Sequence, residues 1–381
     1  MKKDLGLYVH IPFCMKKCGY CDFLSWCGTV EEKEIYVQAL LKEIESYREF
    51  AKGYRVSTVF FGGGTPSILE AEQTERILKK IQEIFELEKR PEITLEMNPG
   101  TVTEEKLRCY QENGVNRLSI GLQSVNNEKL KLLGRIHTYE EFLESYELAR
   151  QTGFDNISVD LISSIPGQKL EEWKEELSVL AALSPEHISV YQLILEEGTP
   201  FFEKYAEHPE LLPEEEESRE IYLWTGKFLK EQRYEQYEIS NYAKPGRESR
   251  HNLKYWERGD YLGLGLGAAS MVRNIRMSNT KDMNIYLERC GQPKTMREDV
   301  QFLEEARQME EFMFLGLRKT RGVSRKEFHR TFGQELDMVY EKALYKCLEN
   351  GLLKEHKDRI FLSEEGMLLS NLVMSEFLFD K

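Results

Sequence analysis

The chain has 381 residues, more than the ~250–300 that one hydrophobic core usually serves, so we expect two or three domains. Its 52 Lys and Arg against 66 Asp and Glu give a net charge of −14, which repels nucleic-acid backbones and anionic membranes. No apolar run reaches the ~18 residues of a membrane-spanning helix, and the N-terminal segment lacks the apolar stretch of an export signal. We therefore expect a cytoplasmic protein that binds no nucleic acid and has no integral membrane segment.

Short apolar runs of β-forming residues recur through the first half of the chain and alternate with helix-like stretches. The expected strands are Leu5–Ile11, Val56–Phe61, Ile93–Met97, Arg117–Gly121, Ile157–Ile162 and Ile188–Leu193. Apolar residues at three-to-four spacing predict helices at Glu31–Phe50, Ala71–Phe85, Glu104–Asn113, Tyr139–Thr152 and Leu170–Leu183. Such alternation is typical of a parallel sheet with helical crossovers. Six strand–helix units are fewer than the eight of a closed TIM barrel, so the sequence predicts an α/β fold with a partial (β/α)6 TIM-like barrel. The active face is expected at the loops that follow the strands.

The second half departs from this alternation near residue 200. An amphipathic helix is expected over Leu212–Arg233, and residues 234–280 mix aromatics, glycines and β-forming residues, as in an appended small sheet. From Val300 onward, three helices and two short strands form a helical, winged-helix-like pattern. Because residues 321–381 hold 10 Lys and Arg against 11 Asp and Glu, we expect a packing or lid role there instead of DNA binding. These changes predict domains at residues 1–200, 201–299 and 300–381.

Four of the seven cysteines lie within fourteen residues near the N-terminus, and the other three are isolated and expected in the core. Cys14, Cys18 and Cys21, spaced CxxxCxxC, follow directly on the first expected strand. Zinc usually takes a fourth protein ligand, which is not found nearby at a suitable spacing. A [4Fe–4S] cluster held by three cysteines would keep one iron open to a small ligand. A zinc or redox protein on the same TIM-like scaffold stays an alternative.

Glycines and polar residues follow the next expected strands, at the same face of the sheet. Gly62-Gly63-Gly64-Thr65-Pro66 comes after the second strand, and glycines let a backbone approach a small ligand closely. Four further polar residues lie at or just after later strands: Glu96, Gln123, Arg135 and Asp160. At one mouth of a sheet, a carboxylate can bind an ammonium group or ribose hydroxyls, and an arginine can bind a carboxylate. A strand-end carboxylate can equally cap a helix, so the combination is the informative feature.

The cysteine spacing, with Tyr20 just before the last cysteine, resembles the radical S-adenosylmethionine (SAM) superfamily, whose members bind SAM at the open iron and cleave it to a 5′-deoxyadenosyl radical. Over essentially the whole chain, the sequence is similar to the oxygen-independent coproporphyrinogen III oxidase family. The resemblance implies a [4Fe–4S] cluster on Cys14, Cys18 and Cys21. It also implies that SAM is contacted by Tyr8, Tyr20, Gly63, Gly64, Thr65, Glu96, Gln123, Arg135, Asp160 and Ile194.

Two features indicate one branch of this family. The porphyrinogen-decarboxylating enzymes typically carry a further cysteine two residues after the third, where this chain has Phe23, and Cys27 lies four residues too late to match it. The run from His251 to Trp256 resembles the HNxxYW motif of the HemW-type branch, regarded as heme chaperones. Imidazole is a good axial ligand of heme iron, and aromatic rings can cover the macrocycle. The resemblance therefore implies heme binding by His251, Tyr255 and Trp256.

The resemblance implies a radical-SAM-type heme chaperone that transfers heme to acceptor proteins and takes electrons from a donor such as flavodoxin or ferredoxin. The alternative within the family is a coproporphyrinogen III oxidase that performs SAM-dependent oxidative decarboxylation. Four arginines near the motif can pair with heme propionates or balance local carboxylates: Arg247, Arg250, Arg273 and Arg276.

The stretch Gly263–Ala268 also fits the G-x-G-x-x-G/A pattern of dinucleotide-binding loops. Its context differs from theirs, because the preceding residues are polar and aromatic and no amphipathic helix follows. We therefore expect close backbone packing near the SAM site instead of NAD binding.

Overall fold

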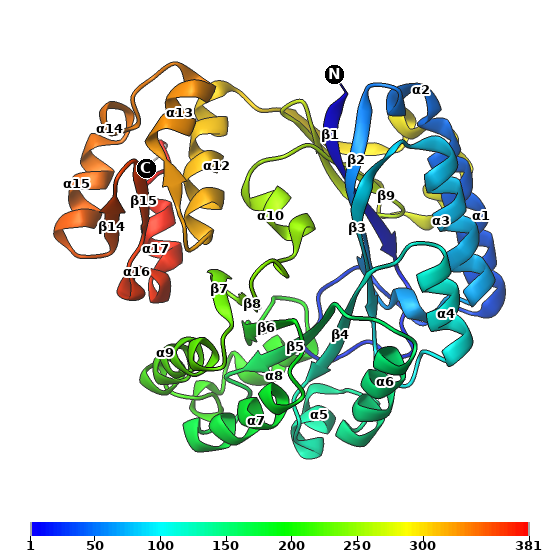
Figure 1. Cartoon of the computed structure of the whole chain (residues 1–381), viewed down its shortest axis with the longest axis horizontal. Helices are drawn as coiled ribbons and strands as arrows, with labels where there is room; N and C mark the ends of the chain where they lie inside the picture. The colour runs from blue at the N-terminus through cyan, green and yellow to red at the C-terminus, as the bar shows by residue number, and fades with distance from the viewer. Residues whose placement is uncertain (1, 380–381) are drawn as a thin grey trace.

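The computed structural model describes residues 2–379 and is built on one sheet of twelve strands (Figure 1). The strand order is β12-β11-β10-β9-β1-β2-β3-β4-β5-β6-β8-β7, and neighbours from β1 to β6 are parallel. These six strands are β1 (Lys3–Ile11), β2 (Tyr54–Gly63), β3 (Leu87–Met97), β4 (Arg117–Gln123), β5 (Ile157–Ser163) and β6 (His187–Gln192). The sheet ends in two edge strands and does not close, which confirms the predicted partial barrel.

Helices connect the parallel strands and cover the outer face of the sheet (Figure 1). They are α1 (Val30–Ser46), α2 (Arg48–Ala51), α3 (Ala71–Ile84), α4 (Glu104–Glu112), α5 (Asn127–Leu133), α6 (Tyr139–Gln151) and α7 (Leu170–Ala182). Several helices begin with side-chain caps. At the start of α1, the Thr29 hydroxyl accepts from the Glu32 amide, and the Glu32 carboxylate accepts from the Thr29 amide. Helix α5, which the sequence did not predict, begins at the Asn126 cap and ends at Gly134, whose φ is 81°.

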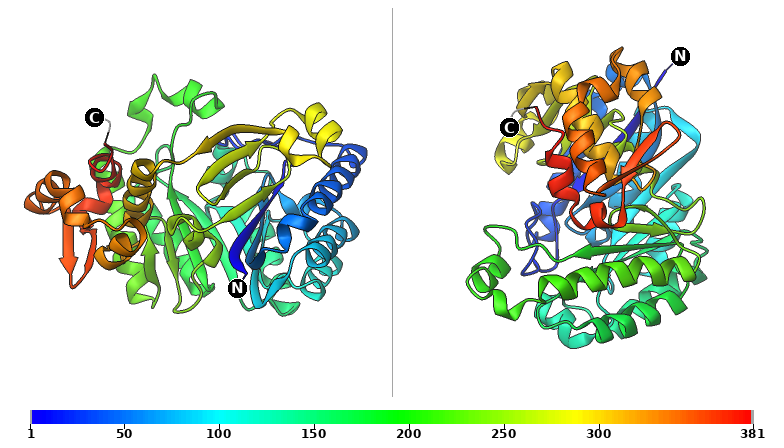
Figure 2. Two further views of the ribbon diagram at one scale, coloured as in Figure 1. Left: turned by 90° about the horizontal axis from the view of Figure 1, so that it is seen from above. Right: turned by 90° about the vertical axis from the view of Figure 1, so that its left-hand side faces the viewer.

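Further strands extend the sheet at both edges. At the β1 edge lie β9 (Tyr261–Leu264), β10 (Ala269–Val272), β11 (Ile275–Asn279) and β12 (Arg297–Phe302), and at the β6 edge lie β8 (Asn241–Ala243) and β7 (Glu235–Glu238). Strand β9 pairs in parallel with β1, with Tyr8 opposite Gly263, and Figure 2 shows these strands in olive to yellow beside the dark-blue β1. The helices of this part are α8 (Pro200–Tyr205), α9 (Glu215–Glu231), α10 (Arg250–Trp256) and α11 (Met283–Arg289).

The glycine-rich stretch between β9 and β10 is closely packed, as predicted. Gly265 has φ of 102°, and a Cβ there would lie 2.7 Å from the His10 carbonyl oxygen. The Gly265 amide donates to the buried carboxylate of Glu43, and the Leu266 amide donates to the Tyr36 hydroxyl. The stretch therefore packs closely against the end of β1 and against α1.

The C-terminal part forms a second, smaller core. It contains α12 (Glu305–Arg318), α13 (Arg325–Phe332), α14 (Leu336–Val339), α15 (Glu341–Glu349), α16 (Glu364–Leu368), α17 (Ser370–Ser375) and the antiparallel strands β13 (Val323–Ser324), β15 (Arg359–Leu362) and β14 (Leu353–His356). Its buried residues, from Met309 to Phe377, are separate from the main core. The domain limits at 200 and 300 stay a prediction, and residues on both sides of 200, such as Ile188 and Ile221, share the main core.

Helix α10 lies between the sheet and the C-terminal helices, in the middle of Figure 1. Backbone bonds also join the C-terminal part to β7, since the Thr320 amide donates to the Tyr237 carbonyl. Within residues 2–379, no helix is both long and apolar enough to cross a membrane.

Candidate functional site

The cysteine loop is closed at its base by backbone hydrogen bonds. It leaves β1 at Ile11 and returns at Trp26, where the Cys14 amide donates to the Trp26 carbonyl at 2.9 Å and the Trp26 amide donates to the Pro12 carbonyl at 3.0 Å. Cys14, Cys18 and Cys21 are partly buried, whereas Cys27 is exposed and donates its thiol to the Met15 carbonyl. The loop therefore gathers three thiols and leaves the fourth outside.

The far side of the loop is held by two helices that come much later in the chain. The Gly19 amide donates to the carbonyl of Leu133 at the end of α5, and the Phe201 amide at the start of α8 donates to the Gly19 carbonyl. Tyr20 packs edge-on against the Phe201 ring, with 6.2 Å between ring centroids. These contacts fix the positions of Cys18 and Cys21 without any ligand.

The donor chemistry suits a metal cluster. Burial raises the pKa of the Cys21 thiol, and the neighbouring Cys18 and Cys14 raise it further, so the three thiols interact electrostatically. Within residues 2–379, no three His, Cys, Asp or Glu side chains approach as closely as the ligands of a single ion do. Three cysteines on one loop, with no fourth cysteine or histidine at a suitable spacing, fit a cluster with an open iron better than a zinc ion, which takes four ligands.

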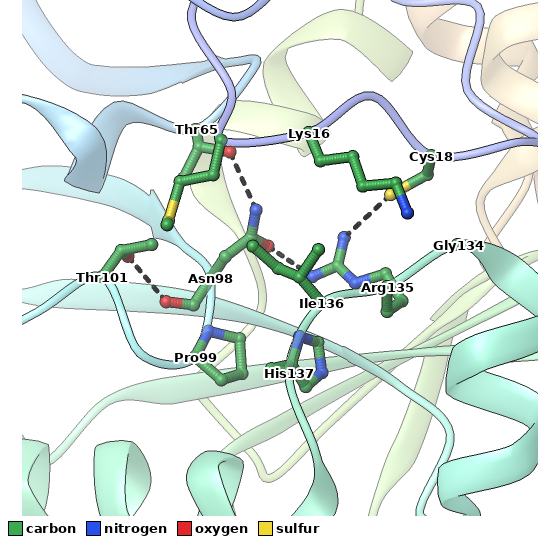
Figure 3. Close-up of a pocket in the computed structure, with 11 residues that line it drawn as sticks. Lys16, Cys18, Thr65, Asn98, Pro99, Thr101, Gly134, Arg135, Ile136 and His137 are labelled. Atoms are coloured by element: carbon green, nitrogen blue, oxygen red, sulfur yellow. Dashed lines mark hydrogen bonds between the residues drawn. The ribbon is translucent and has the colours of Figure 1, made fainter.

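A chain of hydrogen bonds joins two of the cysteines through residues that follow β2, β3 and α5, and Figure 3 shows its part from Thr65 through Asn98 and Arg135 to Cys18. The Thr65 hydroxyl donates to the Cys14 sulfur at 3.5 Å and accepts from the Asn98 amide at 2.8 Å. Arg135 completes the chain, donating to the Asn98 side-chain oxygen at 2.6 Å and to the Cys18 sulfur at 3.6 Å. Another bond, from Arg135 to the Gly121 carbonyl, fixes the guanidinium. Among residues 2–379 the buried Arg135 Nε has no hydrogen-bond partner, which leaves a donor for a ligand.

Asn98 is a site residue that the sequence analysis did not predict. It links Thr65 to Arg135 and lines the small cavity beside Cys18 (Figure 3). Its position could have indicated a role in the site, because Asn98 stands two residues after Glu96 at the end of a predicted strand. Its neutral side chain gave no reason to expect chemistry there.

The glycine segment holds the cysteine loop against β2. The Gly64 amide donates to the Ile11 carbonyl and the Thr65 amide to the Phe13 carbonyl, each at 2.8 Å. A Cβ on Gly64 would lie 2.6 Å from the Phe13 oxygen, and Gly63 has φ of 108°, so neither position accepts a larger residue without strain. The glycines are thus required by packing, in addition to any contact with SAM.

Two buried carboxylates lie deeper in the sheet. Burial, and to a smaller extent the nearby Asp160, raise the pKa of Glu96 to about 8. Burial also raises the pKa of Asp160, which accepts a 3.0 Å hydrogen bond from Ser119. A Cβ on Gly62 would lie 3.1 Å from both Glu96 Oε2 and Tyr8 Cε2, so Tyr8 and Glu96 meet over this glycine.

The remaining predicted SAM residues differ in their surroundings. Gln123 ends β4 with φ of 74°, a left-handed conformation that a residue other than glycine adopts at an energetic cost. Ile194 follows β6 in a loop and is exposed. It lines neither the small cavity beside Cys18 nor the cavity beside Tyr255 and Trp256, so its contact with SAM stays a prediction.

The histidine of the HNxxYW segment is held inside α10 by three neighbours. Its Nδ1 lies 2.8 Å from Thr58 Oγ1, its Nε2 lies 2.8 Å from the Tyr255 hydroxyl, and its ring stacks on Phe60. Burial lowers the pKa of His251 to about 3, so the imidazole is neutral. Glu92 fixes the start of the helix by accepting from the amides of Arg250 and His251. In this conformation both ring nitrogens of His251 already have partners.

A cavity of about 300 Å³ lies beside Tyr255 and Trp256 and falls within the size range of small-molecule sites. It is lined by Tyr8, Tyr255, Trp256, Tyr261, Ala269, Met271, Arg276 and Leu315. Tyr8 belongs to the predicted SAM site, so the two sites are neighbours, while His251 is not among the lining residues. Leu315 comes from α12 of the C-terminal part, and no local sequence signal could have placed it here.

Of the four arginines near the motif, only Arg276 lines this cavity. Arg247 pairs with Asp155 and Arg250 with Glu88, both at the surface. Arg273 donates to the Tyr54 hydroxyl at 3.1 Å. Of the four arginines that the sequence suggests as partners of heme propionates, only Arg276 therefore lies at this cavity.

Comparisons with known proteins agree with this geometry. The Radical SAM superfamily model matches residues 8–180, and the HemN C-terminal domain model matches residues 303–369. The chain is 36% identical to the heme chaperone HemW of Lactococcus lactis over 380 residues, covering 100% of this chain and 99% of the relative. It is also 36% identical to the heme chaperone HemW of Escherichia coli, covering 98% of each.

Among solved structures, the coproporphyrinogen III oxidase HemN of Escherichia coli, a radical SAM enzyme, superposes with a TM-score of 0.86 at 24% identity, covering 99% of this chain and 91% of that one. This likeness confirms the fold. Because the HemW relatives are matched over nearly their whole length at 36% identity, the chain belongs to the HemW family of the radical SAM superfamily.

Proposed function

We propose that this protein is a heme chaperone that binds a [4Fe–4S] cluster, SAM and heme, and passes heme to acceptor proteins. The observation that carries the proposal is the adjacency of two different sites, since Tyr8, a predicted SAM contact that meets Glu96 over Gly62, lines the aromatic cavity. One is a loop of three thiols tied to an arginine, and the other is an aromatic cavity large enough for part of a planar ligand.

Cys14, Cys18 and Cys21 would hold the cluster, which supplies one-electron chemistry and an open iron for SAM when bound. Arg135 would bind the SAM carboxylate, because its buried guanidinium keeps a free donor at Nε. Glu96 and Asp160 would bind the ammonium group or the ribose hydroxyls. Tyr20, Gly63, Gly64, Thr65, Gln123 and Ile194 would complete the site.

Tyr255 and Trp256 would cover the heme, because both line the aromatic cavity. Iron ligation by His251 stays a prediction and requires its Nε2 to exchange the Tyr255 hydroxyl for iron. Until then, His251 positions Tyr255. The acceptor proteins and the electron donor, flavodoxin or ferredoxin, are likewise proposals.

The test is a heme titration of the anaerobic, cluster-loaded protein. A Soret band should develop with wild type and diminish in His251→Ala, and absence of heme binding by wild type would overturn the proposal. An anaerobic assay for protoporphyrinogen and 5′-deoxyadenosine distinguishes the oxidase alternative, because turnover of coproporphyrinogen at enzymatic rates would make the protein an oxidase.

A further inference from the structure

The wall of the aromatic cavity carries a single charged residue among those that line it, Arg276 of β11. The other lining residues are aromatic (Tyr8, Tyr255, Trp256 and Tyr261) or non-aromatic and apolar (Ala269, Met271 and Leu315). An arginine at the edge of an apolar cavity can neutralise one carboxylate of a ligand that is otherwise hydrophobic. The cavity therefore has the composition of a site for a flat ligand with an acidic edge.

Arg276 forms an ion pair with the Glu311 carboxylate, which also pairs with Arg258. Glu311 of α12 pairs with Arg276 at 2.7 Å through one oxygen and with Arg258 at 2.9 Å through the other. The side chains of Glu311 and Arg258 are only 5% and 8% exposed, whereas that of Arg276 is 41% exposed. If Arg276 turned to a ligand, Glu311 would stay paired with Arg258, and no buried charge would be left alone.

Trp256 supplies a second observation that points to a ligand. Its Nε1 is buried and has no hydrogen-bond partner in the part of the chain that the structure describes. Its ring is fixed by the Arg318 guanidinium, 4.3 Å from the ring centroid. A buried indole N–H without an acceptor is unusual and is satisfied when a ligand oxygen reaches it.

We propose that Arg276 is the counter-ion of a heme propionate and that it exchanges Glu311 for this propionate when heme enters. The proposal rests on the proposed function, because it assigns the acidic edge of the same ligand. Since Glu311 and Leu315 both lie on α12, this exchange changes the contact between the C-terminal part and the sheet. The C-terminal part thereby responds to the presence of heme.

The test compares hemin with hemin dimethyl ester, which has the same ring and no propionate charge, in titrations of the cluster-loaded full chain. Wild type should prefer hemin by about tenfold, the amount that one charge-assisted pair supplies. Arg276→Gln should lose this preference while its affinity for the ester stays within about twofold, and Arg276→Lys should recover part of it. Arg273→Gln, on the same hairpin but bound to Tyr54, is the matched control and should keep the preference.

A variant that binds hemin and its ester as wild type does would overturn the role of Arg276 and leave the proposed function standing. Binding of neither ligand by wild type would overturn the proposed function itself. Equal weakening of both ligands in Arg276→Gln would mean that Arg276 only supports the fold of the cavity, and this too would overturn the propionate assignment.

Discussion

The cysteine-loop site and the aromatic cavity are neighbours, yet they are built in opposite ways. The first is assembled from loops that follow consecutive parallel strands, and hydrogen bonds through Thr65, Asn98 and Arg135 join them. The second is assembled from β1, α10, the strands β9, β10 and β11, and one helix of the C-terminal part, with the rings of Tyr255 and Tyr261 in edge-on contact. The sheet therefore fixes the first site in advance, while the second depends on how α12 sits against it.

The largest expected effect breaks the first site alone. Cys14→Ala removes a thiol from the three-cysteine set, so iron and sulfide in the anaerobically reconstituted protein should fall to background. Cys27→Ala is the matched control and should retain about four irons per chain, because Cys27 is exposed and bonded only to the Met15 carbonyl. Cluster loss in both variants, or in neither, would contradict the assignment of the ligands.

A smaller effect on the cluster is expected when the chain of hydrogen bonds between Cys14 and Cys18 is interrupted. Asn98→Ala leaves the Thr65 hydroxyl and the Arg135 guanidinium without their shared partner, which should lower the free energy of unfolding by about 1–3 kcal/mol. The cluster should still assemble. Its midpoint potential, measured by a redox titration followed by EPR, should become more negative because hydrogen bonding to the sulfurs weakens.

Asn350→Ala is the control for this variant, since Asn350 is exposed at the end of α15 and far from the cysteines in the fold. It should leave the potential unchanged. A wild-type potential and wild-type stability in Asn98→Ala would show that the chain of hydrogen bonds has no influence on the cluster.

The second site should be sensitive to acid through His251. Its pKa is lowered to about 3 in the folded protein, whereas an unfolded histidine titrates near about 6.5. The unfolded state thus binds the proton first, so this residue lowers stability as pH falls from about 6.5 toward 3, by up to about 1.4 kcal/mol per pH unit. Urea unfolding between pH 7 and 5 should show a shallower loss of stability in His251→Ala than in wild type, and an equal slope in the two proteins would contradict the assignment.

The smallest effect is expected when one hydroxyl is removed from the aromatic cavity. Tyr255→Phe keeps the ring that lines the cavity and removes the hydroxyl that partners His251 Nε2. The free energy of unfolding should fall by about 1 kcal/mol, the contribution of one buried hydrogen bond. Hemin affinity should change by less than about threefold, because packing against the ring is retained. A loss as large as that of His251→Ala would indicate that the hydroxyl itself contacts the ligand.

The fold was predictable where local patterns decide it. All six parallel strands were placed, because each is a short apolar run that ends before a turn or a helix cap. Helix α5 was missed, since its seven residues are too few to show a periodic pattern. The pairing of β9 with β1 could not be predicted, because it joins residues about 255 positions apart through backbone hydrogen bonds.

The site was predictable to the extent that its residues follow strands in order. Cys14, Gly63 and Glu96 stand at the ends of successive strands, so topology brings them together. Asn98 was missed because a neutral amide has no chemistry of its own. Leu315, which lines the cavity, and Glu311, which pairs with Arg276, were missed because α12 contacts the sheet only when the C-terminal part docks, which no local pattern records.

The claim that two sites stand side by side is tested most directly by a heme titration of the cluster-loaded chain with and without the aromatic wall. Wild type should bind one heme per chain. A variant with both Tyr255→Ala and Trp256→Ala should retain its iron and sulfide but bind heme at least about tenfold more weakly. Unchanged heme affinity in this variant, or loss of its cluster together with its heme, would contradict the separation of the two sites.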